Sequence, residues 1–333
     1  MKVCIVRTLL LIFAVSVACP AWAVDPIQRL RRDSGKKEDE KKDDKKVEKK
    51  DDKPKPPFEV ERIKNLAYRT DKDADPDKHK LDLYLPKGAK NFPVLFFVHG
   101  GAWKSGNKEM YIKFGEAFAG EGIGAVVINY RLSPKVQHPA HIEDVASAFA
   151  WVHANIETYG GRKDRVFICG HSAGGHLVAL LATDEKYLKK EGLSFNDIRG
   201  VIPISGVHNI HAVVPLFKSV FGSDREECRD ASPIAHVGKT HPPFLLMYAD
   251  HDYPTLGHMA EEMNDELKKH KCESQCVCID HRTHISIILM PMTEADELRN
   301  DVLSFIAKHS EWKPASALVE AKKHEGRKKD DKK

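Results

Sequence analysis

A serine framed by glycines is the residue best suited to chemistry in this chain. Gly170-His171-Ser172-Ala173-Gly174 follows an apolar strand pattern at residues 165–169 and precedes a helical pattern at residues 175–182. The two flanking glycines suit a sharp, strained turn, because a side chain at either position would collide with neighbouring backbone. Such a turn raises the serine hydroxyl above a sheet edge. The motif therefore predicts that Ser172 is the nucleophile of an acyl-transfer reaction.

A serine hydroxyl is a poor nucleophile at neutral pH, so the chain must also supply a base and an acid that orients it. Behind a glycine-framed serine the expected chain order is serine, acid, histidine, each at the end of a later strand. Asp250 and Asp252 follow an apolar pattern at residues 244–248. We favour Asp252, since four residues of loop let it turn back over the sheet edge. Asp250 is nearer the strand and is expected to hydrogen-bond the backbone of its own loop.

The histidine of the expected order follows the next strand pattern, residues 274–279. Two histidines lie there, His281 and His284. We favour His284 as the base, because it lies beyond the turn whereas His281 is close enough to belong to the strand. The chain has 18 histidines, so only its place in this order distinguishes His284 from a solvated or structural histidine.

A glycine pair follows another buried strand pattern, residues 93–98, in His99-Gly100-Gly101-Ala102-Trp103. Attack on a carbonyl places negative charge on its oxygen, which needs hydrogen-bond donors already aimed at it. Small residues let the backbone approach a substrate closely. We therefore expect an oxyanion hole built from Gly100, Gly101 and Ala102, together with the backbone N–H of Ala173.

The elements around these motifs alternate between strand and helix patterns. Continuous apolar runs such as Val94-Leu95-Phe96-Phe97-Val98 are typical of strands covered on both faces by helices. The sequence therefore predicts an α/β fold with a mostly parallel sheet of about eight strands, whose first two strands pair antiparallel at one edge. Strands are expected at residues 58–69, 80–85, 93–98, 125–130, 165–169, 200–204, 244–248 and 274–279. Helices with one apolar face are expected at 141–156, 259–269 and 294–308.

Residues 206–242 interrupt this alternation with mixed polar and apolar residues. They are expected to cross the carboxyl edge of the sheet, where ligands bind in such folds. Two hypotheses remain for this segment, a lid over the site and ordinary loop padding.

The two ends of the chain differ in composition from its middle. Lys2 and Arg7 precede an apolar run that ends before Ala21-Trp22-Ala23, which is typical of a cleaved signal peptide at 1–23 and predicts export without stable membrane insertion. Residues 24–57 read as a charged linker ending in prolines and 313–333 as a basic disordered tail. One catalytic domain is expected at 58–312. Its net charge is −5 against +4 for the whole chain, so no nucleic-acid partner is expected.

Cysteine and histidine groups offer little support for a metal centre. Five cysteines remain after cleavage, and we expect Cys169 to be buried in the core. A disulfide from Cys228 to Cys272, Cys276 or Cys278 is left open. His138 with His141, and His208 with His211, are spaced three residues apart but lack a metal-binding partner motif. We expect that the reaction needs neither a metal nor a cofactor.

Taken together, the motifs resemble a known group. His99-Gly100-Gly101-Ala102-Trp103, Tyr130-Arg131-Leu132-Ser133-Pro134 and Gly170-His171-Ser172-Ala173-Gly174-Gly175-His176 resemble the bacterial esterase branch of the α/β-hydrolase fold near hormone-sensitive lipase and kynurenine formamidase. The resemblance runs from about residue 80 to 309 and implies a triad of Ser172, Asp252 and His284. Many relatives have a third glycine where Ala102 stands, so its methyl group is expected to restrict bulky alcohols.

The function expected from these observations is hydrolysis of small or short-acyl carboxylic esters through an acyl-enzyme. Export favours an ester outside the cytoplasm, such as an acyl group on a carbohydrate. Two alternatives stay open. The same triad serves an arylformamidase, amidase or peptidase, and a hydrolase scaffold can also act as a non-catalytic binding module. Oligomeric state, acyl chain length and the ester-versus-amide preference are not determined by the sequence.

Overall fold

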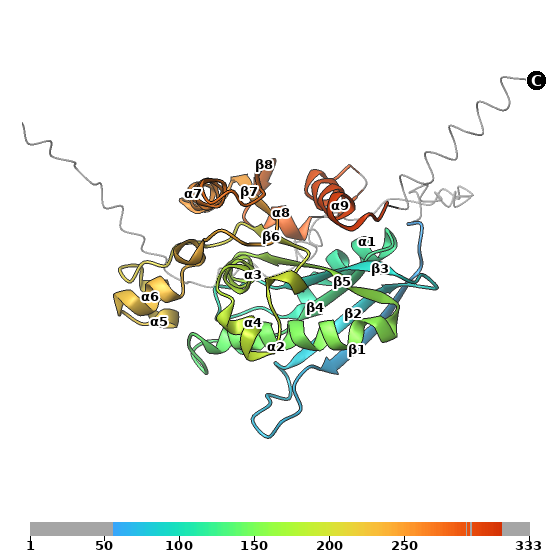
Figure 1. The fold of residues 1–333 in the computed structure, drawn as a ribbon, viewed down its shortest axis with the longest axis horizontal. Helices are drawn as coiled ribbons and strands as arrows, with labels where there is room; N and C mark the ends of the chain where they lie inside the picture. Colours follow the sequence, from blue (N-terminus) through green and yellow to red (C-terminus); the bar gives the residue numbers. More distant parts are fainter. Residues whose placement is uncertain (1–55, 291, 294, 315–333) are drawn as a thin grey trace, which may run out of the picture. The chain divides into compact units, whose positions relative to one another are not determined.

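The computed structural model describes residues 56–290, 292–293 and 295–314 (Figure 1). All of them belong to one compact unit, Pro54–Lys333. The expected signal peptide at 1–23 lies outside the described residues, as do most of the expected linker at 24–57 and of the expected tail at 313–333. Within the described part, no helix has the length and apolar character needed to span a bilayer.

Eight strands form one sheet in the order β1-β2-β4-β3-β5-β6-β7-β8. The pairs β1–β2 and β2–β4 are antiparallel, and every other pair is parallel. The expected α/β class, with an antiparallel edge on a mostly parallel sheet, is confirmed. The strands are β1 (Val60–Ala67), β2 (Lys80–Pro86), β3 (Phe92–Val98), β4 (Gly124–Ile128), β5 (Gly161–His171), β6 (Gly200–Ile204), β7 (Phe244–His251) and β8 (Ser274–Thr283).

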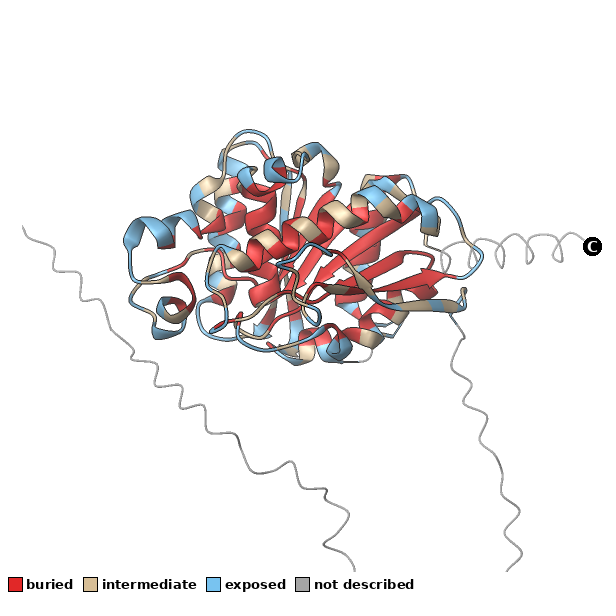
Figure 2. Cartoon of the chain, turned by 90° about the horizontal axis from the view of Figure 1, so that it is seen from below, coloured by how far each residue is buried: buried red, intermediate tan, exposed pale blue. Residues whose placement is uncertain are grey.

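Helices cover both faces of this sheet. One face packs against α2 (Ala140–Asn155), α3 (Ala173–Thr183) and α7 (Leu256–Lys269). The other face packs against α1 (Ile112–Gly120), α8 (Ser286–Leu289) and α9 (Glu297–Ser310). Figure 2 shows the strands and the inward sides of these helices as buried. A short helix, α4 (Lys186–Lys190), follows α3.

Strand β3 shows why its sequence is apolar at every position. Val94, Phe96 and Val98 point into the core on the side of α2 and α3. Leu95 and Phe97 point into the core on the side of α1 and α9. Since side chains alternate between the faces of a strand, a strand buried on both faces requires an unbroken apolar run.

The strands that carry the expected acid and base are longer than their apolar runs. β7 continues through Asp250 to His251, and β8 continues to Thr283, because the two strands stay paired up to His251 and Thr283. Asp252 and His284 are therefore the first residues after their strands rather than members of longer loops. α9 begins at Glu297 instead of the expected residue 294, since the side chain of Asp296 caps it.

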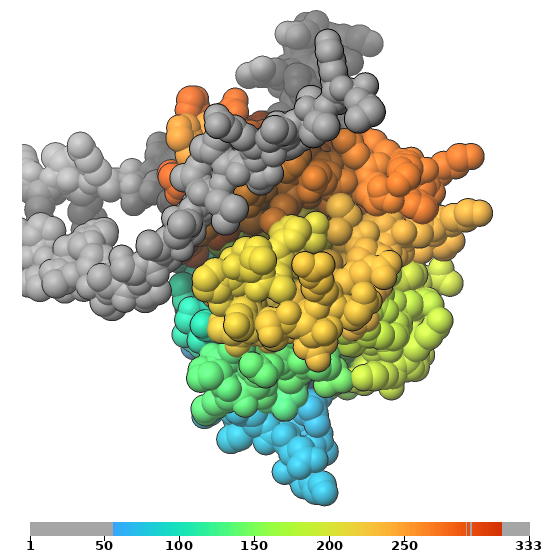
Figure 3. Space-filling view, turned by 90° about the vertical axis from the view of Figure 1, so that its left-hand side faces the viewer, coloured from blue at the N-terminus to red at the C-terminus, as the bar shows by residue number. Residues whose placement is uncertain are grey.

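The segment 206–242 forms three short helical turns rather than an extended loop: α5 (Pro215–Phe221), α6 (Arg225–Asp230) and a 3₁₀ turn (Pro233–His236). We refer to residues 206–242 as the excursion. In Figure 3 the excursion forms the yellow middle of the face toward the viewer. Val213 at its surface is largely exposed, whereas Phe217 and Phe221 of α5 are buried against the rest of the protein.

Candidate active site

The structure brings the three expected residues into one hydrogen-bonded chain at the carboxyl edge of the sheet. Ser172 Oγ lies 2.9 Å from His284 Nε2. His284 Nδ1 lies 2.6 Å from Asp252 Oδ1. In the neutral ring with Nδ1 donating to the carboxylate, Nε2 carries a lone pair that can accept a proton from the serine. These distances are the ones that a nucleophile, a base and an acid orienting the base would need.

Ser172 sits in the strained turn that its glycines predict. Its backbone has φ 55° and ψ −116°, between β5 and α3. A Cβ on Gly170 would lie 2.3 Å from the carbonyl oxygen of Gly174, and a Cβ on Gly174 would lie 2.0 Å from that of Val98. Only glycine fits at both positions, so the turn and the position of the hydroxyl depend on them.

The carboxylate of Asp252 accepts hydrogen bonds from other groups besides His284. Ser205 Oγ donates to Asp252 Oδ2 at 2.5 Å, and the backbone N–H of Ala249 donates to the same oxygen at 3.2 Å. Burial alone would raise the pKa of Asp252, but the hydrogen bonds from His284 and Ser205 outweigh it, so this pKa lies below its usual value. Sequence reasoning missed Ser205, which follows β6 and is brought near only by the order of the strands.

Asp250, the alternative acid, is not the carboxylate hydrogen-bonded to His284, which is Asp252. Its carboxylate accepts hydrogen bonds from the backbone N–H groups of His281 and Arg282, each at 2.9 Å, as well as from its own neighbour His251. The hydrogen bond from the His251 side chain lowers the pKa of Asp250 strongly. Asp250 was expected to bond the backbone of its own loop; it also bonds the end of β8 and so braces the approach to His284.

Two rings lie beside the imidazole of His284. The ring of Tyr253 stacks on it with centroids 4.3 Å apart, and the ring of His171 lies 4.7 Å away. His171 Nε2 also lies 2.8 Å from the carbonyl oxygen of His284, to which it donates. The His284 side chain is 5% exposed, whereas Tyr253 is 57% exposed. The Tyr253 ring therefore covers one face of the His284 imidazole. Neither neighbour was expected, although both directly adjoin predicted site residues.

The oxyanion loop, which we define as residues 99–103, lies beside this chain of bonds. The backbone N–H of Gly100 donates to Tyr111 Oη at 3.2 Å. This N–H group is therefore already paired, whereas Gly100 was expected to be one of the donors of the oxyanion hole. The N–H groups of Gly101, Ala102 and Ala173 have no acceptor among the described residues. Unpaired N–H groups of this kind are what an oxyanion hole would require.

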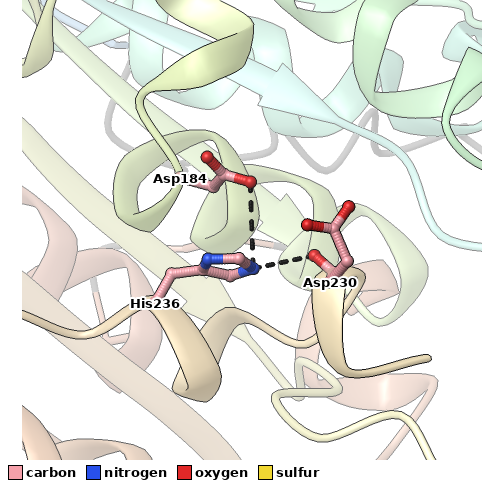
Figure 4. Close-up of side chains that lie close together, drawn as sticks. All are labelled: Asp184, Asp230 and His236. Atoms are coloured by element: carbon pink, nitrogen blue, oxygen red, sulfur yellow. Dashed lines mark hydrogen bonds and ion pairs between the residues drawn. The ribbon is translucent and has the colours of Figure 1, made fainter. Parts of the chain in front are cut away.

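Groups that could hold a metal are limited in the described part of the chain. Among these residues, Asp184, Asp230 and His236 form the one group of three close enough to share an ion (Figure 4). Lys186 Nζ already lies 2.7 Å from Asp184 Oδ2 and 2.6 Å from Asp230 Oδ1. His236 Nε2 lies 2.8 Å from the Asp230 carbonyl oxygen and donates to it. A lysine ammonium thus fills the position of a cation, and we assign no metal site there.

The cysteines of the described residues are all free, and Cys169 is buried as expected. The disulfide left open for Cys228 is not formed in this structure. Cys272 Sγ instead donates to the carbonyl oxygen of Gly238 at 3.2 Å. These thiols lie outside the chain of bonds around Ser172.

Histidines buried around the site predict loss of stability on acidification. Burial lowers the pKa of six histidines to about 4 or about 3: His99, His138, His141, His171, His176 and His208. The unfolded chain takes up protons near pH 6.5, where the folded protein does not. The free energy of unfolding should therefore be retained above about pH 6.5 and fall as the pH drops toward 4, by up to about 1.4 kcal/mol per pH unit for each histidine.

Urea unfolding at pH 7.5, 6.5, 5.5 and 4.5 measures this loss. His258 is a matched control, because its side chain is 70% exposed. His258→Gln should leave the pH dependence unchanged. Equal unfolding free energies at pH 7.5 and 5.5 would contradict the assignment of neutral buried histidines.

Comparisons with known proteins agree with this fold. Esterase B from Lactobacillus rhamnosis has a TM-score of 0.67 at 20% identity, over 78% of this chain and 89% of its own. A truncated form of a carbohydrate esterase from gut microbiota has a TM-score of 0.66 at 21% identity, over 78% of this chain and 99% of its own. These similarities confirm the α/β-hydrolase fold that the motifs predict.

Curated relatives extend the similarity to sequence. The isoprenylcysteine alpha-carbonyl methylesterase ICME of Arabidopsis thaliana is 30% identical over 258 residues, covering 70% of this chain and 60% of its own length. The probable carboxylic ester hydrolase LipM of Mycobacterium tuberculosis is 33% identical over 199 residues, covering 53% of this chain and 45% of its own length. The chain thus spans about half of the length of the curated relatives it matches. A family model described as BD-FAE matches residues 81–267, more than half of the sequence. This chain belongs to the BD-FAE family.

Proposed function

We propose that this protein is a serine carboxylesterase that hydrolyses small carboxylic esters. The observation that carries the proposal is the hydrogen-bonded chain from Asp252 through His284 to Ser172. It is supported by three unpaired N–H groups beside the serine, and by relatives whose names describe ester hydrolysis. The catalytic domain is assigned to residues 58–312.

The reaction follows from the geometry in two balanced halves. Ser172 Oγ attacks the ester carbonyl carbon while its proton moves to His284 Nε2, and the carbonyl π electrons become an oxyanion. The N–H groups of Gly101, Ala102 and Ala173 bind that oxyanion. As it collapses, the bond to the alcohol oxygen breaks and His284 returns the proton to that oxygen. The products of this half are a free alcohol and an acyl group on Ser172.

The second half repeats the first with water as the nucleophile. Water gives its proton to His284 Nε2 and attacks the acyl carbon, and the oxyanion forms at the same place. Collapse breaks the bond to Ser172 Oγ, which takes the proton back, and the carboxylic acid leaves. Asp252 stays ionised and stabilises the imidazolium in both halves, which fits its lowered pKa.

The substrate class we propose is an ester with a short acyl group. The methyl group of Ala102 stands where many relatives carry a third glycine, which favours compact alcohol portions. An acyl group on a carbohydrate is a specific form of this class, and the similarity to a carbohydrate esterase supports it. Export through the expected signal peptide at 1–23 would place the enzyme where such esters occur.

Matched ester and amide substrates test the proposal. We expect the purified protein to hydrolyse p-nitrophenyl acetate and butyrate at least about 100-fold faster than the corresponding p-nitroanilides, and faster than p-nitrophenyl octanoate, measured as kcat/KM. Amide turnover equal to ester turnover would replace the carboxylesterase with an amidase. Turnover of neither, with ester binding retained, would favour a binding module.

A further inference from the structure

Two residues of the oxyanion loop adopt a conformation that their surroundings must enforce. Ala102 has φ 53° and Trp103 has φ 59°. For residues other than glycine this left-handed region costs free energy, so it persists only where neighbouring contacts stabilise it. The N–H groups of the oxyanion loop take their direction from this backbone. Whatever holds Trp103 in place therefore also sets the donors of the oxyanion hole.

The side chain of Trp103 is buried and contacts several neighbours. It is 1% exposed, and its Nε1 donates to His176 Nδ1 at 3.3 Å. Its ring packs edge-on against Phe221 at 5.0 Å and Phe217 at 6.0 Å, both on α5 of the excursion. Its backbone carbonyl accepts a hydrogen bond from the Ser133 N–H at 2.8 Å. Trp103 is therefore fixed from three separate segments.

His176 links this tryptophan to the nucleophile. It lies one turn into α3, and its backbone N–H donates to the carbonyl oxygen of Ser172 at 3.0 Å. Its Nε2 donates to the carbonyl oxygen of Ala231 in the excursion at 2.8 Å. Burial lowers the pKa of His176 to about 3, so the ring is neutral and its Nδ1 carries the lone pair that accepts from Trp103. One imidazole thus joins the oxyanion loop, the nucleophile helix and the excursion.

We propose that Trp103 and His176 are positioning residues for the oxyanion hole, acting through the hydrogen bond between their side chains. The pair keeps the oxyanion loop in its strained conformation and at a set distance from Ser172. Packing of Phe217 and Phe221 against Trp103 makes the excursion the outer support of the pair. This inference rests on the proposed ester hydrolysis, but it assigns roles to residues that neither bind nor react with the ester.

An oxygen-to-sulfur exchange in the substrate distinguishes oxyanion positioning from a general loss of structure. In a thionoester the C=S bond is longer and sulfur accepts hydrogen bonds weakly, so a thionoester gains little from the oxyanion hole. If a variant is partly unfolded, the concentration of active enzyme falls, and turnover of the ester and of the thionoester falls in the same proportion. A displaced oxyanion loop lowers ester turnover alone. The measured quantity is the ratio of kcat/KM for p-nitrophenyl butyrate to that for its thionobutyrate analogue.

Trp103→Phe and His176→Leu are the informative variants. Phenylalanine keeps one aromatic ring in place but removes the Nε1 donor and part of the ring that packs against Phe217 and Phe221. We expect each variant to lose about 10- to 100-fold in kcat on the ester, with KM within about twofold, and to reduce the ester-to-thionoester ratio at least about tenfold. His176→Gln retains an acceptor and a donor and should recover part of the ratio. Trp151→Phe is the matched control, because Trp151 is a half-buried tryptophan on α2 that packs against Tyr159; it should leave the ratio unchanged.

The outcomes separate this inference from the proposed function. A reduced ratio in Trp103→Phe, absent in Trp151→Phe, supports the positioning role. Ratios equal to that of the wild-type protein in both Trp103→Phe and His176→Leu would overturn it while ester hydrolysis stands. A wild-type protein that is inert on every ester would overturn the proposed function and this inference together.

Discussion

Ser172→Ala is expected to lower kcat for p-nitrophenyl butyrate by roughly 10⁴-fold or more, with the melting temperature almost unchanged. Alanine removes the attacking oxygen but keeps the turn, whose backbone is determined by Gly170 and Gly174. Among the described residues, Ser172 supplies the hydroxyl that is bonded to His284. The measurement is steady-state turnover with the background rate of hydrolysis subtracted.

A matched serine and a covalent probe sharpen that experiment. Ser304 lies exposed on α9, where it donates to the backbone of its own helix, so Ser304→Ala should keep full activity. An alkyl phosphonate ester with a good leaving group should label the wild-type protein once, at Ser172, and leave Ser172→Ala unlabelled. Activity that survives Ser172→Ala would show that another residue is the nucleophile, and the proposed mechanism would be wrong.

Asp252→Asn is expected to lower kcat by about 10³- to 10⁴-fold at pH 7.5, with KM little changed. The amide keeps the shape of the side chain but has only one oxygen and no negative charge. It therefore cannot accept hydrogen bonds from both Ser205 Oγ and His284 Nδ1, as the two carboxylate oxygens do. His284 then favours the tautomer with its proton on Nε2, which cannot accept the proton of Ser172. The measurement is kcat and KM across pH 6 to 9, together with urea unfolding to show that folding is retained.

Asp250→Asn is the matched control, because Asp250 lies two residues from Asp252 and the carboxylate hydrogen-bonded to His284 is that of Asp252. It weakens the bracing of His281 and Arg282 but keeps one amide oxygen as an acceptor. We expect its kcat to fall less than about tenfold, because the orienting acid remains. A larger loss in Asp250→Asn than in Asp252→Asn would reverse the assignment of the acid.

Much of the site follows from local sequence, because its motifs are local. The glycines beside Ser172 predict a tight turn for steric reasons that hold in any context, and the strain appears at φ 55°. The apolar run of β3 predicts burial on both faces, which the two halves of the core confirm. The order of serine, acid and histidine depends only on the order of the strands. Each of these inferences uses residues within one element or the sequence of elements.

Strand ends were harder to predict, because pairing rather than composition determines them. The polar residues Asp250 and His251 look like a loop, yet backbone pairing between His251 and Thr283 extends both strands. A polar residue at the end of a strand loses little free energy when it extends the pairing, because the backbone hydrogen bonds of the two strands are already aligned. The expected distance of Asp252 from its strand was therefore too long, although the choice of Asp252 agrees with the bond to His284.

What the sequence by itself determined is the class of fold, the turn at Ser172 and the order of the residues that follow it. What only the tertiary structure decided is the set of partners that hold these residues in place. Ser205 bonds Asp252, His171 bonds the His284 carbonyl, and His176 bonds Trp103. These partners come from segments far apart in the chain, and their contacts arise when the strands assemble side by side. A buried hydrogen bond needs both groups within about 3 Å at the right angle, and no local pattern of residues encodes that distance.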